Sequence, residues 1–193
     1  MSLGSANYVT WTLFRILRKS VNDAYISKDE SQKDSIILSI ILAVTCVESF
    51  TNCYYQQIIN SKPLDDIIKK ELQGTIDKRS GNMIDKINTL SRGLFTREHD
   101  WQKGIAKQFE ELKDKRNQLI HFKPNFDDYE VSTNIVIKNL TKIELITNLK
   151  YSDASEALRV AEEFVEQTII ISGTDTNDIP GAMHYWTGKM PTA

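Results

Sequence analysis

Residues 34–60 read DSIILSIILAVTCVESFTNCYYQQIIN, and they carry the strongest periodic pattern in the chain. Steps of four and three residues place six side chains of this stretch on one stripe of an α-helix. Those side chains are Ile37, Ile41, Val44, Glu48, Thr51 and Tyr55. Neighbouring apolar residues widen the stripe, and a helix this broadly apolar is typical of the centre of a helical bundle.

Helical periods also occur on both sides of this central stretch. Apolar residues recur at helical spacing over residues 8–27, 64–72, 83–90, 101–122 and 153–172. The 193 residues include only four prolines and eight glycines, and this scarcity favours long helices over a β-rich fold. The sequence predicts an all-α, up-and-down bundle of about five helices in a single domain over residues 5–173, followed by a polar C-terminal tail over residues 174–193.

Proline and glycine mark several of the expected helix boundaries. Pro63 stands where a missing N–H costs little, so we expect it to open a helix that ends near Gly74. Gly173 is placed to cap the last helix. The residue before a proline disfavours the α conformation, so Pro124 is expected to stop the helix that precedes it.

Residues 125–150 follow a different pattern from the rest of the chain. Apolar and β-branched residues alternate with polar ones at two places, which suggests either a small β-hairpin or an irregular insertion before the last helix. The alternating positions are Val131, Thr133, Ile135 and Ile137, and then Ile143, Leu145 and Thr147.

Two further features lie outside the periodic segments. The tail contains His184-Tyr185-Trp186, which either covers a groove on a partner subunit, tucks Trp186 onto its own bundle or stays mobile. His99 stands beside Asp100 in a connector, and we expect it to be a capping or surface residue.

Composition excludes several classes of protein. The 24 Lys and Arg residues against 26 Asp and Glu residues give a formal net charge of −2, which excludes a globally basic nucleic-acid binder but not a local basic patch. Cys46 and Cys53 are too few for a disulfide scaffold and are expected to be reduced. The longest apolar stretch, residues 36–47, is too short to span a bilayer, and no signal peptide precedes it, so we expect a cytoplasmic protein without membrane contact. The sequence contains neither a phosphate-binding loop nor a metal-binding motif, and predicts no cofactor and no metal.

One cluster of residues with chemical potential lies at the end of the helix over 101–122. Residues 113–124 read KDKRNQLIHFKP, so Arg116, Asn117 and His121 all come just before the helix stop. His121 falls in the last turn, where unpaired carbonyl groups favour a protonated imidazole, and Asn117 lies four residues upstream on the same face. The alternative is that Arg116 is a surface ion-pair residue and His121 only a helix-terminal cap.

Glu48 is the one acidic residue in the apolar stripe of the central helix. A carboxylate in this position is expected to be partly buried, and a buried charge needs a partner. Arg116 is the natural candidate for that partner. The alternative is that Glu48 lies at the edge of the helix and reaches water.

The pattern Arg-Asn-x-x-x-His, in the context Lys-Arg-Asn-Gln-Leu-Ile-His-Phe, resembles the signature of the HEPN superfamily (higher eukaryotes and prokaryotes nucleotide-binding). Many members also carry an acidic residue in a central helix, and the stretch 47–52 with Glu48 is similar to that setting. The resemblance covers residues 8–122 and 153–172, and it implies an α-helical bundle that is typically dimeric.

The resemblance implies metal-independent endonucleolytic cleavage of RNA by a homodimer. His121 would act as the acid and base, Arg116 would stabilise the charge on the phosphorane, and Asn117 would position His121 or the phosphate. Glu48 would hold Arg116 in place. Such a ribonuclease could be a toxin or defence enzyme with a cognate antitoxin protein as partner; the alternative is a non-catalytic HEPN-fold module for dimerisation or for binding a nucleotide or protein.

Lysine residues surround the motif. Lys113, Lys115 and Lys123 could bind the phosphate backbone of an RNA substrate. They could equally form an ordinary solvated face, because Glu110, Glu111 and Asp114 lie close by in the sequence.

Overall fold

The computed structural model describes residues 6–78, 81–120 and 145–190. Within these residues the chain is helical and forms no strand. Seven helices of nine residues or more are present: α1 (Ala6–Ile26), α2 (Glu30–Ser61), α3 (Asp66–Asp77), α4 (Met83–Leu94), α5 (Gly104–Ile120), α7 (Tyr151–Ile171) and α8 (Ile179–Thr187). The predicted all-α bundle is therefore confirmed.

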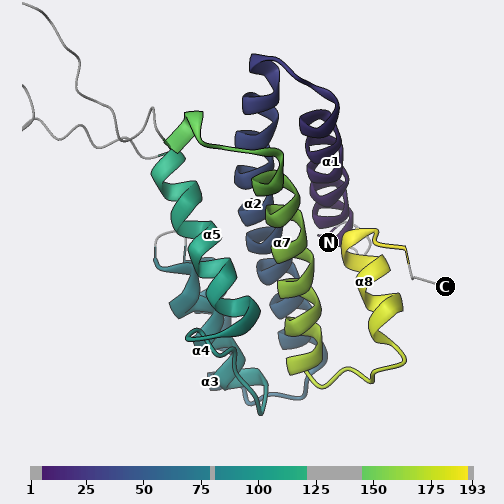
Figure 1. Cartoon of the computed structure of the whole chain (residues 1–193). Helices are drawn as coiled ribbons and strands as arrows, with labels where there is room; N and C mark the ends of the chain where they lie inside the picture. Colours follow the sequence, from purple (N-terminus) through teal and green to yellow (C-terminus); the bar gives the residue numbers. More distant parts are fainter. Residues whose placement is uncertain (1–5, 79–80, 121–144, 191–193) are drawn as a thin grey trace, which may run out of the picture.

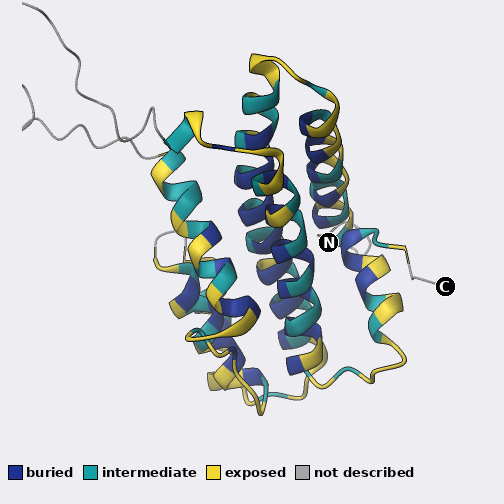
Figure 2. Ribbon diagram, viewed as in Figure 1, coloured by how far each residue is buried: buried dark blue, intermediate teal, exposed yellow. Residues whose placement is uncertain are grey.

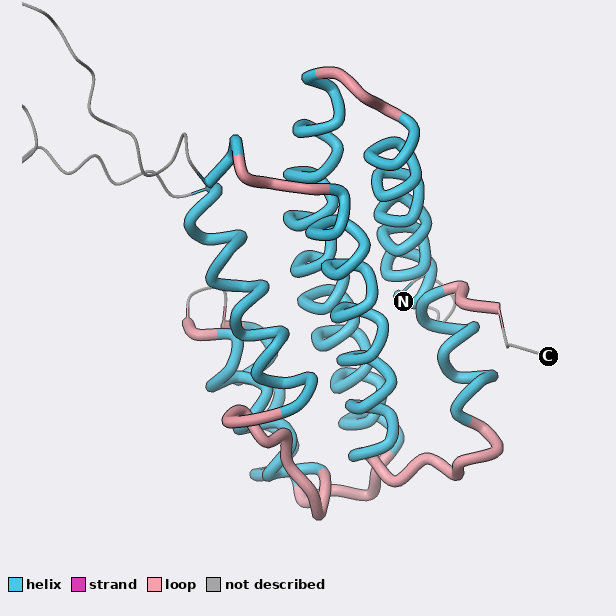
Figure 3. Tube along the Cα trace, in the orientation of Figure 1, coloured by secondary structure: helices cyan, strands magenta, loops and turns pink. Residues whose placement is uncertain are grey.

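Helix α2 lies at the centre of the bundle, as its broadly apolar surface predicts. Helices α1 and α7 pack along it, α5 packs against both α2 and α7, and α8 covers α1 and α7 on the opposite side of the bundle from α5 (Figure 1). The short helices α3 and α4 pack on each other and on the C-terminal part of α2. Short loops join α1 to α2 at one end of the bundle and α7 to α8 at the other (Figure 3).

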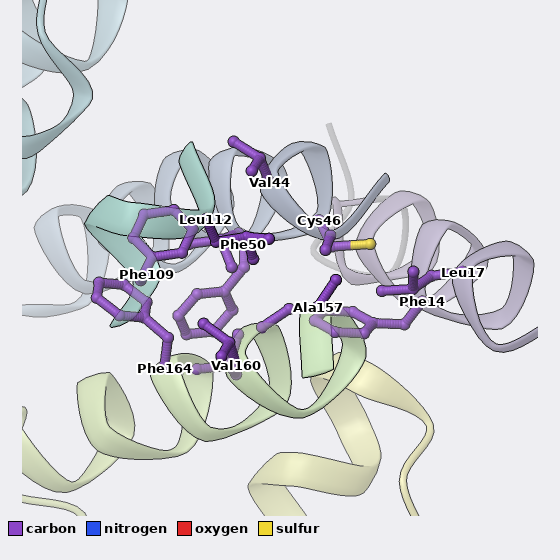
Figure 4. Close-up of a cluster of buried hydrophobic side chains, with 14 of the residues drawn as sticks. Phe14, Leu17, Val44, Cys46, Phe50, Phe109, Leu112, Ala157, Val160 and Phe164 are labelled. Atoms are coloured by element: carbon purple, nitrogen blue, oxygen red, sulfur yellow. The ribbon is translucent and has the colours of Figure 1, made fainter. Parts of the chain in front are cut away.

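The core forms where the apolar faces of these helices meet (Figure 2). Phe50 of α2, Phe109 of α5 and Phe164 of α7 are all buried, and Phe109 and Phe164 have ring centroids 4.5 Å apart. Phe14 and Leu17 extend the same cluster onto α1 (Figure 4). This packing holds α5 beside α2, so that polar side chains on the two helices can contact each other.

Helix α2 also has the length and hydropathy of a membrane-spanning helix. Its 32 residues include an 18-residue window with mean hydropathy 1.9, and half of that window is buried inside the bundle. A helix surrounded by other helices must be apolar around most of its circumference, so its central position accounts for this composition.

Several helix boundaries differ from the prediction. Helix α3 begins after Asp65, whose side chain accepts a hydrogen bond from the Ile67 N–H, so Pro63 precedes the helix instead of opening it. The helix also continues through Gly74 to Asp77, because a glycine inside an exposed helix costs only about 1 kcal/mol. Gly173 does follow α7 with φ of 88°, as predicted.

The predicted polar tail is wrong for residues 179–187, which form helix α8. Met183 and Trp186 are buried, and Trp186 lies edge-on against Phe50 and Tyr54 with ring centroids 5.4 and 5.6 Å apart. Trp186 thus tucks onto its own bundle, which was one of the alternatives. Apolar residues at steps of four and three make α8 amphipathic, and the polar residues around it hide this short pattern in the sequence.

The predicted insertion lies mostly outside the described residues, which resume at 145. Residues 145–147 are helical, so the alternation at Leu145 and Thr147 does not mark a strand. Three residues can alternate by chance, and the chain here turns toward Tyr151, the first residue of α7.

His99 is a core residue, and its predicted surface or capping position is wrong. Only 5% of it is exposed, and its ring stacks on Phe164 with centroids 4.5 Å apart. Thr168 uses its hydroxyl proton for the Phe164 carbonyl group, so Nε2 of His99 donates to Thr168 Oγ1 at 3.1 Å. Nδ1 is then an unprotonated acceptor, buried without a hydrogen-bond partner among the described residues. Burial lowers the pKa of His99 to about 4.

We expect His99 to make the protein less stable as the pH falls from about 6.5 toward 4. The unfolded chain binds a proton at His99 near pH 6.5, whereas the folded chain resists protonation until about pH 4. The free energy of unfolding is therefore higher above pH 6.5, by up to about 3 kcal/mol, than at pH 4 on account of His99 alone. This difference is lost as the pH falls from about 6.5 to about 4. Urea unfolding of the wild type and of His99→Gln at several pH values measures it. Because carboxylates titrate in both proteins, the prediction concerns the difference between their pH slopes, and equal slopes would contradict it.

Candidate functional site

The site forms around an ion pair between α2 and α5. Arg116 Nη2 donates a hydrogen bond to Glu48 Oε1 at 2.7 Å. The predicted contact between these two residues is therefore confirmed. The Glu48 side chain is still 40% exposed, so it also meets solvent, and it is less buried than its place in the apolar stripe suggests.

The guanidinium group of Arg116 is held more tightly than an ordinary surface arginine. Its side chain is 20% exposed, and its Nε is buried without a hydrogen-bond partner within the described ranges. A single charge-assisted hydrogen bond to Glu48 fixes one edge of the planar fork. Arg116 Nη2 is thus engaged with Glu48 and Nε is buried, so an anion can approach only through the exposed fifth of the side chain.

The rest of the motif is only partly described. Asn117 lies on α5 next to Arg116 and is partly buried, and its side chain makes no hydrogen bond to another described residue. His121 follows Ile120, the last residue of α5, and lies outside the described residues, as does Lys123. The structure therefore brings Arg116 and Glu48 together, with Asn117 as the next residue on α5, and the predicted roles of Asn117, His121 and Lys123 stay predictions.

The two described lysines near the motif are both paired with carboxylates. Lys115 Nζ lies 2.5 Å from Asp153 Oδ1, and Lys113 Nζ lies 3.0 Å from Asp114 Oδ1. Burial raises the pKa of Asp153, but hydrogen bonds from Lys115 and from the Lys150 backbone outweigh it and leave that pKa below its usual value. Much of the positive charge next to Arg116 is thus already neutralised by the protein.

A cavity of about 620 Å³ has Glu48 among its lining residues. It is bounded by α2, the C-terminal end of α3 and the N-terminal half of α4, and thirteen described residues line it. Sequence reasoning missed it, because its walls come from three helices and most of its residues read as ordinary surface residues. One signal in the sequence was the set of polar residues Glu48, Thr51 and Asn52, which follow the apolar middle of the central helix.

Neither cysteine is activated as a nucleophile at neutral pH. Cys46 and Cys53 are both free, as predicted. Burial raises the pKa of Cys46 to about 12 and also raises the pKa of Cys53 above its ordinary value. A thiol that stays protonated is a poor nucleophile.

Neither the geometry of the site nor similarity to known proteins identifies the function of the site directly. The described residues contain no group of three or more His, Cys, Asp or Glu side chains that could hold a metal ion. Comparisons with models of known families, with curated proteins and with solved structures find no match. The function must therefore be argued from the residues of the site.

Proposed function

We propose that the protein is a HEPN-like, metal-independent endoribonuclease that acts as a homodimer. The observation that carries this proposal is the 2.7 Å ion pair between Arg116 and Glu48. It holds a partly exposed guanidinium group at the end of α5, five residues before His121. A fixed arginine can stabilise a phosphorane, and a histidine that follows it by five residues in the sequence is proposed to supply the proton transfer.

The proposed reaction is an internal transfer within the RNA chain. The ribose 2′-oxygen attacks the adjacent phosphorus and forms a new P–O bond, while the bond from phosphorus to the 5′-oxygen breaks. One imidazole takes the proton of the 2′-hydroxyl, and an acid gives a proton to the departing 5′-oxygen. The products are a 2′,3′-cyclic phosphate and a 5′-hydroxyl group. Arg116 stabilises the negative charge on the phosphorane, and Asn117 positions His121 or the phosphate.

The need for two proton-transfer groups favours a dimer. Each chain has three histidines, but His99 is buried against Phe164 and is not accessible to RNA. His184 lies on α8, on the opposite side of the bundle from α5 (Figure 1). A second copy of the chain, related by two-fold symmetry, can supply a second His121 to the same cleft.

Phosphate binding by the neighbouring lysines is a secondary part of the proposal. Lys113, Lys115 and Lys123 are proposed to contact the RNA backbone. Because Lys115 and Lys113 already pair with Asp153 and Asp114, an RNA phosphate has to replace those carboxylates. We therefore assign most of the binding at the cleavage site to Arg116.

The biological setting proposed for such an enzyme is that of a toxin or defence ribonuclease in the cytoplasm, controlled by an antitoxin protein. The second candidate function is a non-catalytic module that forms dimers or binds a nucleotide or a protein. The cavity next to Glu48 favours this alternative, because a built pocket beside the motif needs no cleavage to be useful.

RNA cleavage in the presence of EDTA tests the proposal. We expect the wild type to cleave RNA and to leave 2′,3′-cyclic phosphate ends, because no step requires a metal ion. His121→Ala, purified in the same way, controls for contaminating nuclease and should leave the RNA intact. Equal cleavage by both proteins, or ends of another chemistry, would contradict the proposal, and absence of cleavage across a range of RNAs would favour the binding module.

A further inference from the structure

Helix α2 keeps one side of its N-terminal half uncovered by the other described helices. Helices α1, α5 and α7 pack along α2, whereas α3 and α4 contact it further on, through Tyr55 and Gln56. Helices α1 and α5 lie at the two flanks of α2, and α7 covers the side between them (Figure 1). The side of α2 opposite α7 is therefore left open.

This open side of α2 is apolar. The central position of α2 accounts for the buried half of its most hydrophobic window, but residues 35–47 contain no charged side chain on any side. Leu38 is 46% exposed, and Ile41 and Leu42 on the same side are partly exposed. A helix side that stays in water usually carries charged residues, as α7 does with Arg159 and its two glutamate partners.

Helix α1 extends the open side with two more aliphatic residues. Val9 is 52% exposed and Ile16 is 39% exposed. Ser20, one turn after Ile16, donates a hydrogen bond to the Ser35 carbonyl oxygen of α2 at 2.9 Å, so this flank of α1 borders α2. Arg18 lies about 200° around the helix from Ile16 and pairs with α7. Val9 and Ile16 therefore lie on the side of the bundle away from α7.

Helix α5 borders the open side from the other flank. Ile120 is 44% exposed and lies one turn after Arg116, which contacts Glu48 of α2. Lys115 pairs with Asp153 of α7 and so points away from Ile120 around the helix. We call the following set of residues from the three helices the open face: Val9, Ile16, Leu38, Ile41, Leu42 and Ile120.

The open face is large enough for a stable interface between two proteins. Residues 34–48 of α2 span about 21 Å, and three helices side by side at a spacing of about 9 Å are about 28 Å wide. The footprint is then about 600 Å², which is close to the roughly 800 Å² of accessible surface that each partner buries in a stable complex. Exposed apolar patches of this size mark interaction sites.

We propose that two copies of the chain associate through the open face, with their α2 helices antiparallel. The choice of a second copy rests on the proposed function, which needs a second His121 at the same cleft. A two-fold axis that makes the α2 helices antiparallel also places α5 beside the partner's α5. Ile120, and with it the His121 that follows in the sequence, then comes from both copies to one edge of the interface.

Sedimentation velocity of the full chain over a range of concentrations tests this interface. We expect the wild type to form a dimer and Leu38→Glu to raise its dissociation constant at least about 100-fold. Two-fold symmetry places two new carboxylates in the apolar interface for each substitution, and burying unpaired charges is costly. Ile16→Glu changes another helix of the open face and should have an effect in the same direction.

A matched control separates the open face from the general effect of adding charge. Ile170 on α7 is 43% exposed, close to the exposure of Leu38, and lies outside the open face. Ile170→Glu should therefore leave the dissociation constant unchanged. Circular dichroism of the three variants monitors the fold, and the partial exposure of each replaced side chain lets the monomer tolerate the change.

The outcomes distinguish the interface from the ribonuclease. A monomeric wild type, or equal weakening of the dimer by Leu38→Glu and Ile170→Glu, would overturn the interface. A monomer that binds vesicles of phosphatidylcholine and phosphatidylglycerol through Leu38 would overturn it too and assign the open face to a membrane. A dimer that Leu38→Glu dissociates supports the interface even if the wild type cleaves no RNA, whereas cleavage by a dimer that survives this substitution supports the ribonuclease alone.

Discussion

Replacing Arg116 with alanine is expected to lower the rate constant for RNA cleavage by about 10²- to 10³-fold, with the fold preserved. The guanidinium group is proposed to stabilise charge that develops only in the transition state, and removal of one such donor has effects of this size. Stability should change little, because the Glu48 side chain left behind is 40% exposed and can be hydrated. Single-turnover cleavage kinetics measure the rate, and circular dichroism monitors the fold.

Glu48 provides a sharper test of how the arginine acts. Because Glu48 is proposed to position Arg116 without contacting RNA, Glu48→Gln should lower the rate by only about tenfold. In the background of Arg116→Ala, the Glu48→Gln change should have no further effect. Additive losses in the double variant would show that Glu48 acts on its own and not through Arg116.

A matched control exists for the loss of an arginine. Arg92 on α4 forms an ion pair with Glu98 at 3.0 Å, and both side chains are largely exposed. Arg92→Ala removes the same side chain from a surface ion pair, which contributes about 0–1 kcal/mol. Cleavage by this variant should equal that of the wild type. If Arg92→Ala and Arg116→Ala lose activity equally, the effect comes from overall charge, and the assignment of Arg116 is wrong.

Replacing Trp186 with alanine is expected to lower the free energy of unfolding by about 3–5 kcal/mol. The indole ring is 3% exposed and packs edge-on against Phe50 and Tyr54 of the central helix. Its removal opens a cavity where α8 meets α2, and it also loses two favourable aromatic contacts. Urea unfolding followed by circular dichroism measures the change.

The neighbouring residue supplies the control for this prediction. Tyr185 is 42% exposed and belongs to the same short helix. Tyr185→Ala should therefore lower the free energy of unfolding by no more than about 1 kcal/mol. Equal, small effects of the two substitutions would mean that α8 does not dock on the bundle in solution.

The positions of the long helices follow from local sequence alone. Apolar residues at steps of three and four mark α1, α2 and α7, because the helical period depends only on residues within one turn of each other. The contact of Glu48 with Arg116 was also predictable, since a carboxylate in an apolar stripe needs a partner and Arg116 lies near the end of a neighbouring predicted helix. The predicted roles of these residues in catalysis go further, and the cleavage experiments address them.

Tertiary structure decided the features that depend on which helices become neighbours. His99 reads as a polar residue in a connector, and only the packing of that connector on α7 places its ring on Phe164. Trp186 stands in a polar segment, and only its packing against Phe50 and Tyr54 of α2 explains its burial. The second environment of Glu48, the cavity, exists because α3 and α4 fold back onto α2. Periodicity reports on neighbours along one helix. Burial and cavities arise from contacts between residues that are distant in sequence, and the pattern within one segment carries little information about such contacts.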